Sequence, residues 1–497
     1  MFKGTTKIEL TNVKTGAKEI YQHENMVTNA VNDVLGMNPM GFKGMLADHS
    51  MLFPVVPKLI GGIMLCEKQL EENPEKYWVP NDNPIVGYSG FSVSDGADPK
   101  RGSLNQLESG ELEDGSGYRF VFDFATSQGN GVISALGLTS DAGGSNGYGN
   151  LVTSKNGIQE YYSHSTDEDD YPLGITAFQE CGTNMANIVT LRPEKNEAVA
   201  IWKSAAKTYN IRKSYLPLTS IGLFDSPKLF PYDYRFTDRT VYTSTFGVSD
   251  TYYSFVRGDD GYIWGFEHSD GAYGNDSGSA SVNWVKINLD DFSIEEGTWS
   301  LDAQLMPFGV YNPPGTSRSV KNHCIVHGGF LYCFSYDRKG IYKIELKNIT
   351  NIVFMEYPDG TIDMTPAWNS SNDWCYTAFN VMYDTVYFTN GYIEGNSIVC
   401  TKKYAYSSSG GTQFSSQPAG ILRTAKPGLR VGPFLLMGGM WLYLSDQHNA
   451  FSVALLSNYL ATINNLMEPV EKTAEKTMKI TYILRMIPEV IPEEETE

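Results

Sequence analysis

The sequence predicts a mainly β protein, in which a β-propeller-like repeat array is inserted into a small α+β base domain formed by both termini. Glycine and aromatic residues are abundant, with 48 Gly, 31 Tyr and 24 Phe, and this composition favours strands joined by tight turns. Segments with aromatic strand cores recur through the middle of the chain, and alternating apolar and polar residues mark strands near both ends. The length of 497 residues allows two or three domains or one large repeat array.

The amino-terminal segment predicts a β-hairpin followed by a short helix. Residues 7–21 alternate between apolar and polar side chains on both sides of a turn at Lys14–Gly16, where glycine provides the positive φ that the turn needs. Asn25 is a candidate N-cap for a helix that Gly36 would end. Residues 37–115 contain many Gly, Pro and Asn and predict loop-rich, ordered structure.

A second hairpin is predicted over residues 118–140. Gly129–Gly131 would form its turn, and Val132–Leu138 would be the returning strand. The first strand carries three phenylalanines on one face, namely Phe120, Phe122 and Phe124. Such a hairpin would be a packing element of the base domain.

The carboxyl-terminal segment predicts one more strand, because residues 477–484 alternate. A lone terminal strand needs a partner, and the strand of similar character is Lys7–Val13 at the other end of the chain. We therefore expect both termini to lie in one base domain, residues 1–140 completed by residues 466–497. Residues 141–465 would form the propeller-like domain.

The middle of the chain contains a self-similar unit. Aromatic strand cores recur at intervals of roughly 55 to 70 residues, as in propeller blades with long loops; they are Asn196–Lys203, Asp260–Phe266, Gly328–Phe334, Asp384–Asn390 and Gly438–Leu444. A second strand follows some cores, as in Val282–Leu289 and Gly340–Asn348. The pattern predicts five to seven blades, depending on whether residues 140–190 add one, and a β-sandwich array is the alternative. A closed ring is favoured because neighbouring sheets then cover each other and few edges stay open.

The acidic composition limits the partners. The formal net charge of -19 would repel a phosphate backbone and an anionic membrane surface, so neither nucleic acid nor membrane insertion is expected. The six cysteines are scattered without a C-x-x-C pair and predict buried free thiols, as in a protein made in a reducing cytoplasm; they are Cys66, Cys181, Cys324, Cys333, Cys375 and Cys400. A disulfide between distant positions, such as Cys324 and Cys375, remains an alternative.

No export or membrane segment is expected. The chain begins directly with a strand-like pattern and lacks the charged and apolar regions of a signal peptide. The longest apolar stretch, residues 431–444, is too short and too rich in glycine to cross a bilayer. A protein of this kind that acts outside a cell would leave it by lysis or inside a particle.

The sequence carries no motif of a common enzyme class, and no enzymatic activity is expected. A serine-hydrolase elbow, a phosphate-binding Gly-Lys motif, a dinucleotide fingerprint and the H-E-x-x-H zinc motif are all absent. A glycosidase or lyase could still place paired carboxylates on different strands. Its candidate residues are Asp233, Asp259, Asp260, Glu267 and Asp363, for which a solvated loop position is the simpler interpretation.

Two acidic loops could bind a hard cation such as Ca²⁺ through oxygen ligands. The first is Ser165–Pro172, with Asp167, Asp169 and Asp170 as candidate ligands, and the second is Ser269–Gly278. Neither matches an EF-hand loop, and an acidic surface loop is the simpler interpretation. No other cofactor is expected.

Aromatic residues in loops are the candidates for carbohydrate binding, because an aromatic face offers apolar area to the C–H face of a sugar. Tyr232, Tyr234 and Trp368 lie in predicted loops. By contrast, Trp202, Trp264 and Trp441 lie inside strand cores and are expected to be buried between blades.

Three segments resemble virion-associated proteins encoded by phages and prophages of Gram-positive bacteria. They are Thr6–Leu35, Phe122–Ser140 and Pro469–Arg485, so the resemblance covers the ends and the first part of the chain but not its middle. It implies a shared attachment module at the termini and a variable middle that faces outward, as in tail fibre or baseplate proteins.

These observations predict a virion structural protein, a tail fibre or baseplate component that binds host cell-surface carbohydrate. Other virion proteins, a host glycan and further copies of the chain are the expected partners, because multivalency multiplies weak sugar affinity. One alternative is a polysaccharide-degrading tail enzyme, either a glycosidase or a lyase. The other is a capsid or collar decoration protein without a ligand.

Overall fold

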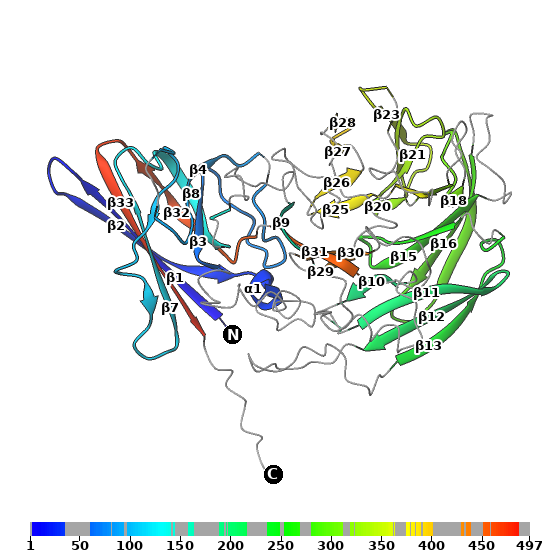
Figure 1. Ribbon diagram of the computed structural model, residues 1–497, viewed down its shortest axis with the longest axis horizontal. Coiled ribbons are helices and arrows are strands. Elements are labelled where there is room, and N and C mark those ends of the chain that lie inside the picture. Colours follow the sequence, from blue (N-terminus) through cyan, green and yellow to red (C-terminus); the bar gives the residue numbers. More distant parts are fainter. Residues whose placement is uncertain are drawn as a thin grey trace, which may run out of the picture. The chain divides into compact units, whose positions relative to one another are not determined.

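A computed structural model describes most of the chain, and in the described residues it is nearly all β, as predicted, with one short helix, α1 (Asn29–Val34) (Figure 1). The described residues are 2–34, 60–80, 82–93, 97–140, 143–144, 158–163, 188–192, 195, 197–215, 236–248, 253–268, 280–311, 319–322, 324–360, 362, 374–377, 379–382, 384–388, 391–400, 429–431, 434–438, 451–457 and 459–486.

The chain divides into two compact units. The base unit comprises residues 1–35, 48–154 and 457–497, and the propeller unit comprises residues 36–47 and 155–456. The expected domain limits were 140/141 and 465/466. The base unit extends further into the chain at both places, and one reason is that a strand of its sheet begins at Thr462.

One large sheet forms the base unit. Its strands follow the order β4-β3-β8-β32-β2-β1-β33-β7-β5, and β6 pairs with β7. The two ends of this path meet, because Tyr88 at the end of β4 forms a parallel bridge with Arg101 beside β5. The sheet is therefore nearly closed, like a barrel. The strands are β1 (Phe2–Asn12), β2 (Lys18–Val27), β3 (Gly62–Cys66), β4 (Ile85–Ser89), β5 (Ser103–Leu104), β6 (Gly110–Glu111), β7 (Gly117–Phe124), β8 (Gly131–Thr139), β32 (Thr462–Lys472) and β33 (Lys476–Met486).

The two ends of the chain lie side by side in this sheet. Strands β1 and β33 pair antiparallel along their whole length, from Phe2 opposite Met486 to Asn12 opposite Lys476. Strand β1 also pairs with β2 through a tight turn, in which Gly16 has a φ of 70°. Both predictions for the termini, the first hairpin and the terminal strand pair, are confirmed.

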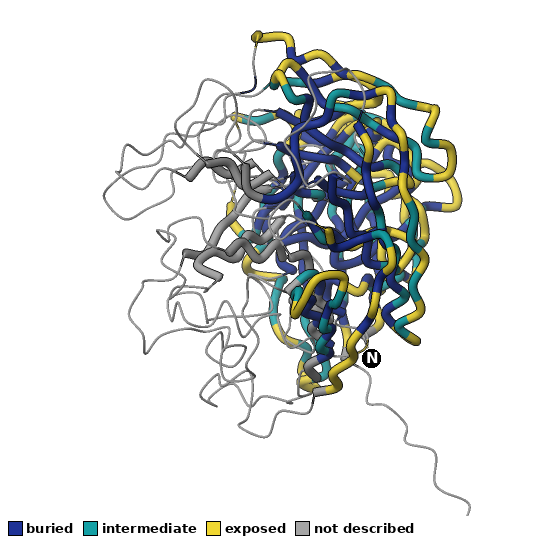
Figure 2. The backbone as a smooth tube through the Cα atoms, turned by 90° about the vertical axis from the view of Figure 1, so that its right-hand side faces the viewer, coloured by how far each residue is buried: buried dark blue, intermediate teal, exposed yellow. Residues whose placement is uncertain are grey.

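Alternation along the strands fills the inside of the barrel with apolar side chains. Ile8 and Leu10 of β1 and the three phenylalanines of β7 are fully or almost fully buried, and the rings of Phe120 and Phe122 stack at 6.4 Å. Met478, Ile480, Tyr482 and Leu484 of β33 fill the space between them. Figure 2 shows buried and exposed stretches alternating along the described chain.

The prediction of a second hairpin is wrong. Strand β7 pairs with β33, whereas β8 pairs with β3 and β32, so the two strands are not neighbours. Residues 125–130 between them form a turn, in which the Gln128 N–H donates to the Ala125 carbonyl oxygen at 3.0 Å, and this turn binds a charged group. The ammonium of Lys472 donates to the carbonyl oxygen of Ala125 at 2.9 Å and to Asn130 Oδ1 at 2.8 Å.

The predicted start of the helix is also wrong. Strand β2 continues to Val27, and the Asn25 amide points into the barrel, where it donates to Thr6 Oγ1 at 2.7 Å. Asn25 therefore does not cap the helix. Helix α1 begins at Asn29, after the strand has ended.

The propeller unit consists of five four-stranded sheets and one three-stranded sheet in its described residues. Blade 1 is β10 (Ile188–Arg192), β11 (Glu197–Ala205), β12 (Thr208–Tyr215) and β13 (Phe236–Tyr242); blade 2 is β14 (Tyr253–Arg257), β15 (Tyr262–His268), β16 (Ala280–Asn288) and β17 (Ile294–Leu301). Blade 3 is β20 (Ile325–His327), β21 (Phe330–Phe334), β22 (Gly340–Glu345) and β23 (Ile352–Glu356); blade 4 is β25 (Asn380–Met382), β26 (Thr385–Phe388), β27 (Gly391–Glu394) and β28 (Ser397–Cys400). Blade 5 is β29 (Leu429–Val431), β30 (Phe434–Gly438), β31 (Phe451–Ser457) and β9 (Ile158–Ser163), and the smaller sheet is β18 (Gly309–Tyr311), β19 (Ser319–Asn322) and β24 (Trp374–Thr377).

The recurrent aromatic cores occupy the same strand position in each of blades 1 to 4. In blades 1 to 4 the predicted core is the second strand, namely β11, β15, β21 and β26. The second strand of blade 5 is β30, which ends at Gly438, so all but the first residue of the fifth predicted core lie outside the described residues. The predicted follower strands are the third strands of blades 2 and 3, β16 and β22.

Two observations fit a propeller-like arrangement of these sheets. Strand β9 comes from the beginning of the propeller unit but completes blade 5, which comes from its end. In addition, the first strand of blade 1, β10, contacts the first strands of both blade 2 and blade 5, β14 and β29. In the described part of residues 140–190, the chain therefore contributes one strand to blade 5 and begins blade 1, and adds no separate blade.

Candidate functional site

The residues predicted to bind sugar or metal fall outside the described residues. Tyr232 and Tyr234 belong to the segment that joins β12 to β13 in blade 1, and Trp368 belongs to the segment between β23 and β24. Asp167, Asp169 and Asp170 of the first acidic loop, and the whole second acidic loop, are outside as well. Among the residues with described positions, no group of three or more His, Cys, Asp or Glu side chains is arranged to hold a metal ion.

Three of the five candidate carboxylates have described positions, and two of them lie in the turn between β14 and β15. Asp259 accepts a hydrogen bond from the Gly328 amide and lies 3.3 Å from His327 Nδ1 in blade 3. Burial tends to raise the pKa of Asp259, but His327 and the Gly328 amide outweigh burial and hold that pKa below its usual value. Asp260 accepts from the Trp264 indole at 3.2 Å. Asp259 thus links blades 2 and 3, while Asp260 orders its own hairpin.

The third, Glu267, is fully buried and belongs to a pair of carboxylates that bind the link between blades 1 and 2. Glu267 accepts from the backbone N–H groups of Gly247 and Val248, at 2.7 and 3.1 Å. Glu296 of β17 accepts from the N–H groups of the three residues before them, Ser244, Thr245 and Phe246, at 2.6, 2.8 and 3.2 Å. Five successive amides therefore bind two carboxylates, as in an anion-binding nest.

These hydrogen bonds lower the pKa of Glu296. Burial tends to raise its pKa, but the Ser244 and Thr245 hydroxyl and amide groups prevail and lower the pKa to about 2. Glu296 is thus an ionised structural clamp between two blades. Asp233 and Asp363, the other two candidates for a glycosidase or lyase, lie outside the described residues.

The polar face of blade 1 is the described surface that best suits a ligand. Strands β11, β12 and β13 turn their odd-numbered apolar side chains toward blade 2, including Val199, Ile201, Tyr209, Ile211 and Val241. Their even-numbered side chains lie on the other face. We call six of these the blade-1 face: Trp202, Asn210, Arg212, Asp238, Thr240 and Tyr242.

Strand register fixes the layout of the blade-1 face. Trp202, Asn210 and Thr240 are opposite one another in a row across the three strands. Tyr242, which is 71% exposed, follows Thr240 on the same face of β13. Because neighbouring side chains across strands are about 5 Å apart, the two aromatic residues flank a short polar strip.

An ion pair holds the indole ring in place. Arg212 Nε and Nη2 donate to Asp238 Oδ1 and Oδ2, each at 2.7 Å, and the guanidinium lies 5.5 Å from the centre of the Trp202 ring. A bidentate pair of this kind is geometrically specific. Asn210 Oδ1 accepts from Thr240 Oγ1 at 3.0 Å, which orients the amide.

Several polar groups of this face remain available to a ligand. Within the described structure, the Trp202 indole N–H, Asn210 Nδ2 and the Tyr242 hydroxyl make no hydrogen bond. Ordered aromatic rings beside amide and hydroxyl groups are what a saccharide requires, since rings pack on its C–H face and polar groups bind its hydroxyls.

The prediction that Trp202 is buried is wrong, whereas Trp264 is buried, as predicted, and Trp441 lies outside the described residues. Trp202 is only partly buried because it alternates with Val199 and Ile201 and falls on the opposite face of β11. Residues 199–202 carry no local signal that separates the two faces, because Val199, Ala200, Ile201 and Trp202 are all apolar.

The cysteines with described side chains are free thiols. Cys66, Cys324 and Cys333 are buried, as predicted, and Cys400 is partly buried. Because Cys324 is a free thiol, the alternative of a disulfide with Cys375 is wrong. Burial raises the pKa of the Cys66 thiol to about 12.

Comparison with known proteins gives little further guidance. No family model matches the chain, and no curated protein matches it. Among solved structures, apo AztD from Citrobacter koseri is similar to 66% of this chain and 89% of its own chain, with 10% sequence identity and a TM-score of 0.16. In the searched part of the structure, no helix has the length and apolar character to span a bilayer.

Proposed function

We propose that this chain is a virion structural protein of the tail fibre or baseplate type, in which the base unit attaches to the particle and the propeller unit binds host cell-surface carbohydrate. The observation that carries the proposal is the joining of both termini in one sheet, with the propeller unit inserted between them. An insertion of this kind lets one part vary in its loops while the other part keeps its attachment surface.

The blade-1 face supports the carbohydrate part of the proposal. It offers two aromatic rings, an ordered amide, hydroxyl groups and an ion pair on a rigid sheet. Sites built on strands hold their geometry better than sites on loops. Single sugar sites are weak, and several copies in one particle would provide the necessary avidity. The proposed role involves no catalytic step.

A binding experiment with purified chain tests the carbohydrate part. Full-length protein, clustered on beads, is expected to bind isolated cell-wall or capsule polysaccharide of the host. Trp202→Ala is expected to weaken this binding by about tenfold or more, because a central aromatic contact carries much of the affinity of a small site.

The matched control is Phe354→Ala, which removes another exposed ring, 45% accessible, from blade 3. Equal binding by the parent chain and Trp202→Ala would rule out the blade-1 face. Absence of binding by the clustered parent chain would leave only the structural role. That role is tested separately, by labelling the chain in purified particles and locating it by electron microscopy.

A further inference from the structure

In the described structure, one edge of strand β2 is unpaired over most of its length. On one side it pairs with β1 from Lys18 to Asn25, but on the other side it meets β32 only at Met26 and Val27. Strand β32 leaves β2 because it pairs with β8, with a register shift between Asn465 and Val470. In the described structure, the second edge of β2 therefore faces no strand from Lys18 to Glu24.

The hydrogen-bonding groups on this edge follow from the β1–β2 register. The Asn12 N–H donates to the Ala17 carbonyl oxygen at 2.9 Å, so residues 12 and 17 form a hydrogen-bonded pair. Bonded and non-bonded pairs alternate along an antiparallel ladder. The odd residues of β2 thus use their backbone groups on β1, and four even residues direct theirs outward: Lys18, Ile20, Gln22 and Glu24.

Nothing in the described part of the chain covers these four residues. None of their outward N–H or C=O groups has a backbone partner there, and the Ile20 side chain is 53% exposed. Natural proteins protect such edges with proline, bulges or a covering segment. Residues 18–24 contain no proline, and their register with β1 is continuous.

The charges on this edge are complementary to themselves. If two copies of β2 lie antiparallel with Tyr21 opposite Tyr21, Lys18 of each copy is opposite Glu24 of the other, and Glu19 is opposite His23. The same arrangement puts Ile20 opposite Gln22, so every outward-directed residue meets another outward-directed residue. A shift of two residues in either direction loses the Lys18–Glu24 match.

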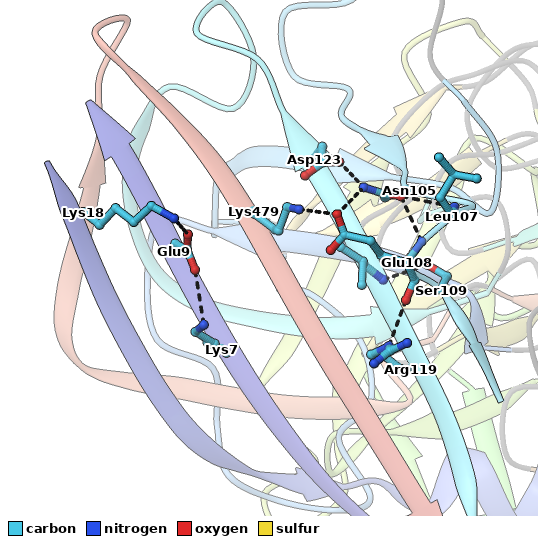
Figure 3. A network of polar contacts seen from close by, with 11 residues as sticks. Lys7, Glu9, Lys18, Asn105, Leu107, Glu108, Ser109, Arg119, Asp123 and Lys479 are labelled. Atoms are coloured by element: carbon cyan, nitrogen blue, oxygen red, sulfur yellow. Dashed lines mark hydrogen bonds and ion pairs between the residues drawn. The ribbon is translucent and has the colours of Figure 1, made fainter. Parts of the chain in front are cut away.

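We propose that β2 of a second copy of this chain adds antiparallel to this edge, around a two-fold axis at Tyr21. A two-fold contact uses the same surface twice, so its sequence must be self-complementary, and β2 meets this condition. Lys18 already binds Glu9 at 2.6 Å, and Glu24 binds Lys3 at 2.8 Å, as Figure 3 shows for Lys18 and Glu9. These pairs would join into one network across the interface. The proposal is independent of any ligand of the propeller unit.

Cross-linking of the full chain tests the register. In the proposed pair, Tyr21 is opposite Tyr21 of the second copy at a non-bonded position, where Cα atoms are about 4.5 Å apart. The Tyr21→Cys variant is therefore expected to form a covalent dimer with glutathione disulfide. Two thiols lose two electrons and two protons to form the disulfide, and glutathione disulfide is reduced to two glutathione molecules.

Glu24→Cys is the matched control on the same strand. Residue 24 and its copy would lie about 20 Å apart, six residues along a strand, and should not cross-link. Mass spectrometry identifies the linked residues. Absence of the Tyr21→Cys dimer, or an equal yield from Glu24→Cys, would overturn the proposed register.

Charge exchange tests the contact without a cross-link. Sedimentation velocity is expected to show a concentration-dependent dimer of the parent chain. Lys18→Glu and Glu24→Lys should each weaken it by about tenfold, because each puts like charges opposite each other twice, and the double variant should restore it. The exposed turn variant Lys14→Glu is the control. A monomer at all concentrations, or a dimer insensitive to both single changes, would refute the proposal.

Discussion

Lys472 is a buried cation of the base unit, with only 1% of its surface exposed, and among the described residues no carboxylate binds it. Its three hydrogen-bond acceptors are the carbonyl oxygens of Ala125 and Thr126 and the side chain of Asn130. Burial lowers the pKa of Lys472 from 10.5 to about 8. The residue therefore orders the loop between β7 and β8 at the expense of a desolvated charge.

The pH dependence of stability follows from this pKa. Below pH 8 the lysine is charged in both the folded and the unfolded chain, and its desolvation cost is fully present. Between pH 8 and 10.5 the unfolded chain holds more protons, so this group makes the free energy of unfolding rise with pH, by up to about 3 kcal/mol.

We therefore expect Lys472→Met to lose this rise. Urea unfolding at pH 8 and pH 10 compares the variant with the parent chain, and with Lys100→Met as an exposed control. As pH increases from 8 to 10, the free energy of unfolding of the parent chain should rise relative to that of Lys472→Met. The difference between the parent and Lys100→Met should not change with pH. Identical pH slopes for the parent and Lys472→Met would contradict the assignment.

At the scale of secondary structure elements, the positions of strands were predicted better from the sequence than the pairing between strands. The first hairpin, the terminal pair β1–β33 and the second strands of four blades were correct because alternation and aromatic clusters report a buried face. The pairing of β7 with β8 was wrong because alternation does not say which strand lies alongside. Lys472, which binds the intervening loop, is more than 340 residues away in the sequence, and no local pattern reveals this contact.

The candidate site was less predictable for a similar reason. The predicted loop aromatics Tyr232, Tyr234 and Trp368 lie outside the described residues and stay a prediction, and the described candidate, the blade-1 face, lies on strands β11 to β13. Trp202 can be assigned to a polar face only when Asn210 and Thr240 are known to be its neighbours. That neighbourhood depends on a pairing between strands separated by a connection of 20 residues, 216–235.

The clamp between blades 1 and 2 gives the prediction at this scale. The pKa of Glu296 is lowered from 4.5 to about 2, so the clamp contributes stability that is fully present above pH 4.5 and is lost as pH falls toward 2. Glu296→Gln should lower the stability of the propeller unit at pH 7 by about 1 to 2 kcal/mol, allowing for partial exposure.

The measurement is the thermal unfolding midpoint at pH 7, 5 and 3. The loss caused by Glu296→Gln should be large at pH 7 and 5 and smaller at pH 3. The exposed neighbour Glu295→Gln provides the control, and it should change little at any pH. A Glu296→Gln deficit that stays constant down to pH 3 would show that lost packing, and not the ionised clamp, causes the effect.

At the scale of the whole molecule, the two units close in different ways. In the propeller unit, β9 pairs with β31 in blade 5, so strands from the beginning and the end of that unit meet in one sheet. The sheet of the base unit becomes nearly closed only when β33, the last strand in the described residues, inserts between β1 and β7. Folding of the base unit therefore depends on strands from the two ends of the chain, whereas blade 5 of the propeller unit is completed by strands that lie between them.

This difference predicts the effect of a truncation. A chain ending at Thr473 lacks β33 and loses its buried side chains Met478, Ile480, Tyr482 and Leu484. Burial of each such side chain contributes about 1.5 to 3 kcal/mol, and their sum is comparable with the 5 to 15 kcal/mol that stabilises a typical domain. We expect the base unit of the chain ending at Thr473 to be unfolded and its propeller unit to remain folded.

A chain ending at Met486 keeps β33 and is the matched control. Limited proteolysis with mass spectrometry should release peptides of β1, β2 and β7 early from the shorter chain, while the described strands of blades 1 to 4 resist. Protection of β1 and β7 in the chain ending at Thr473 would mean that the terminal pair is not what closes the base unit.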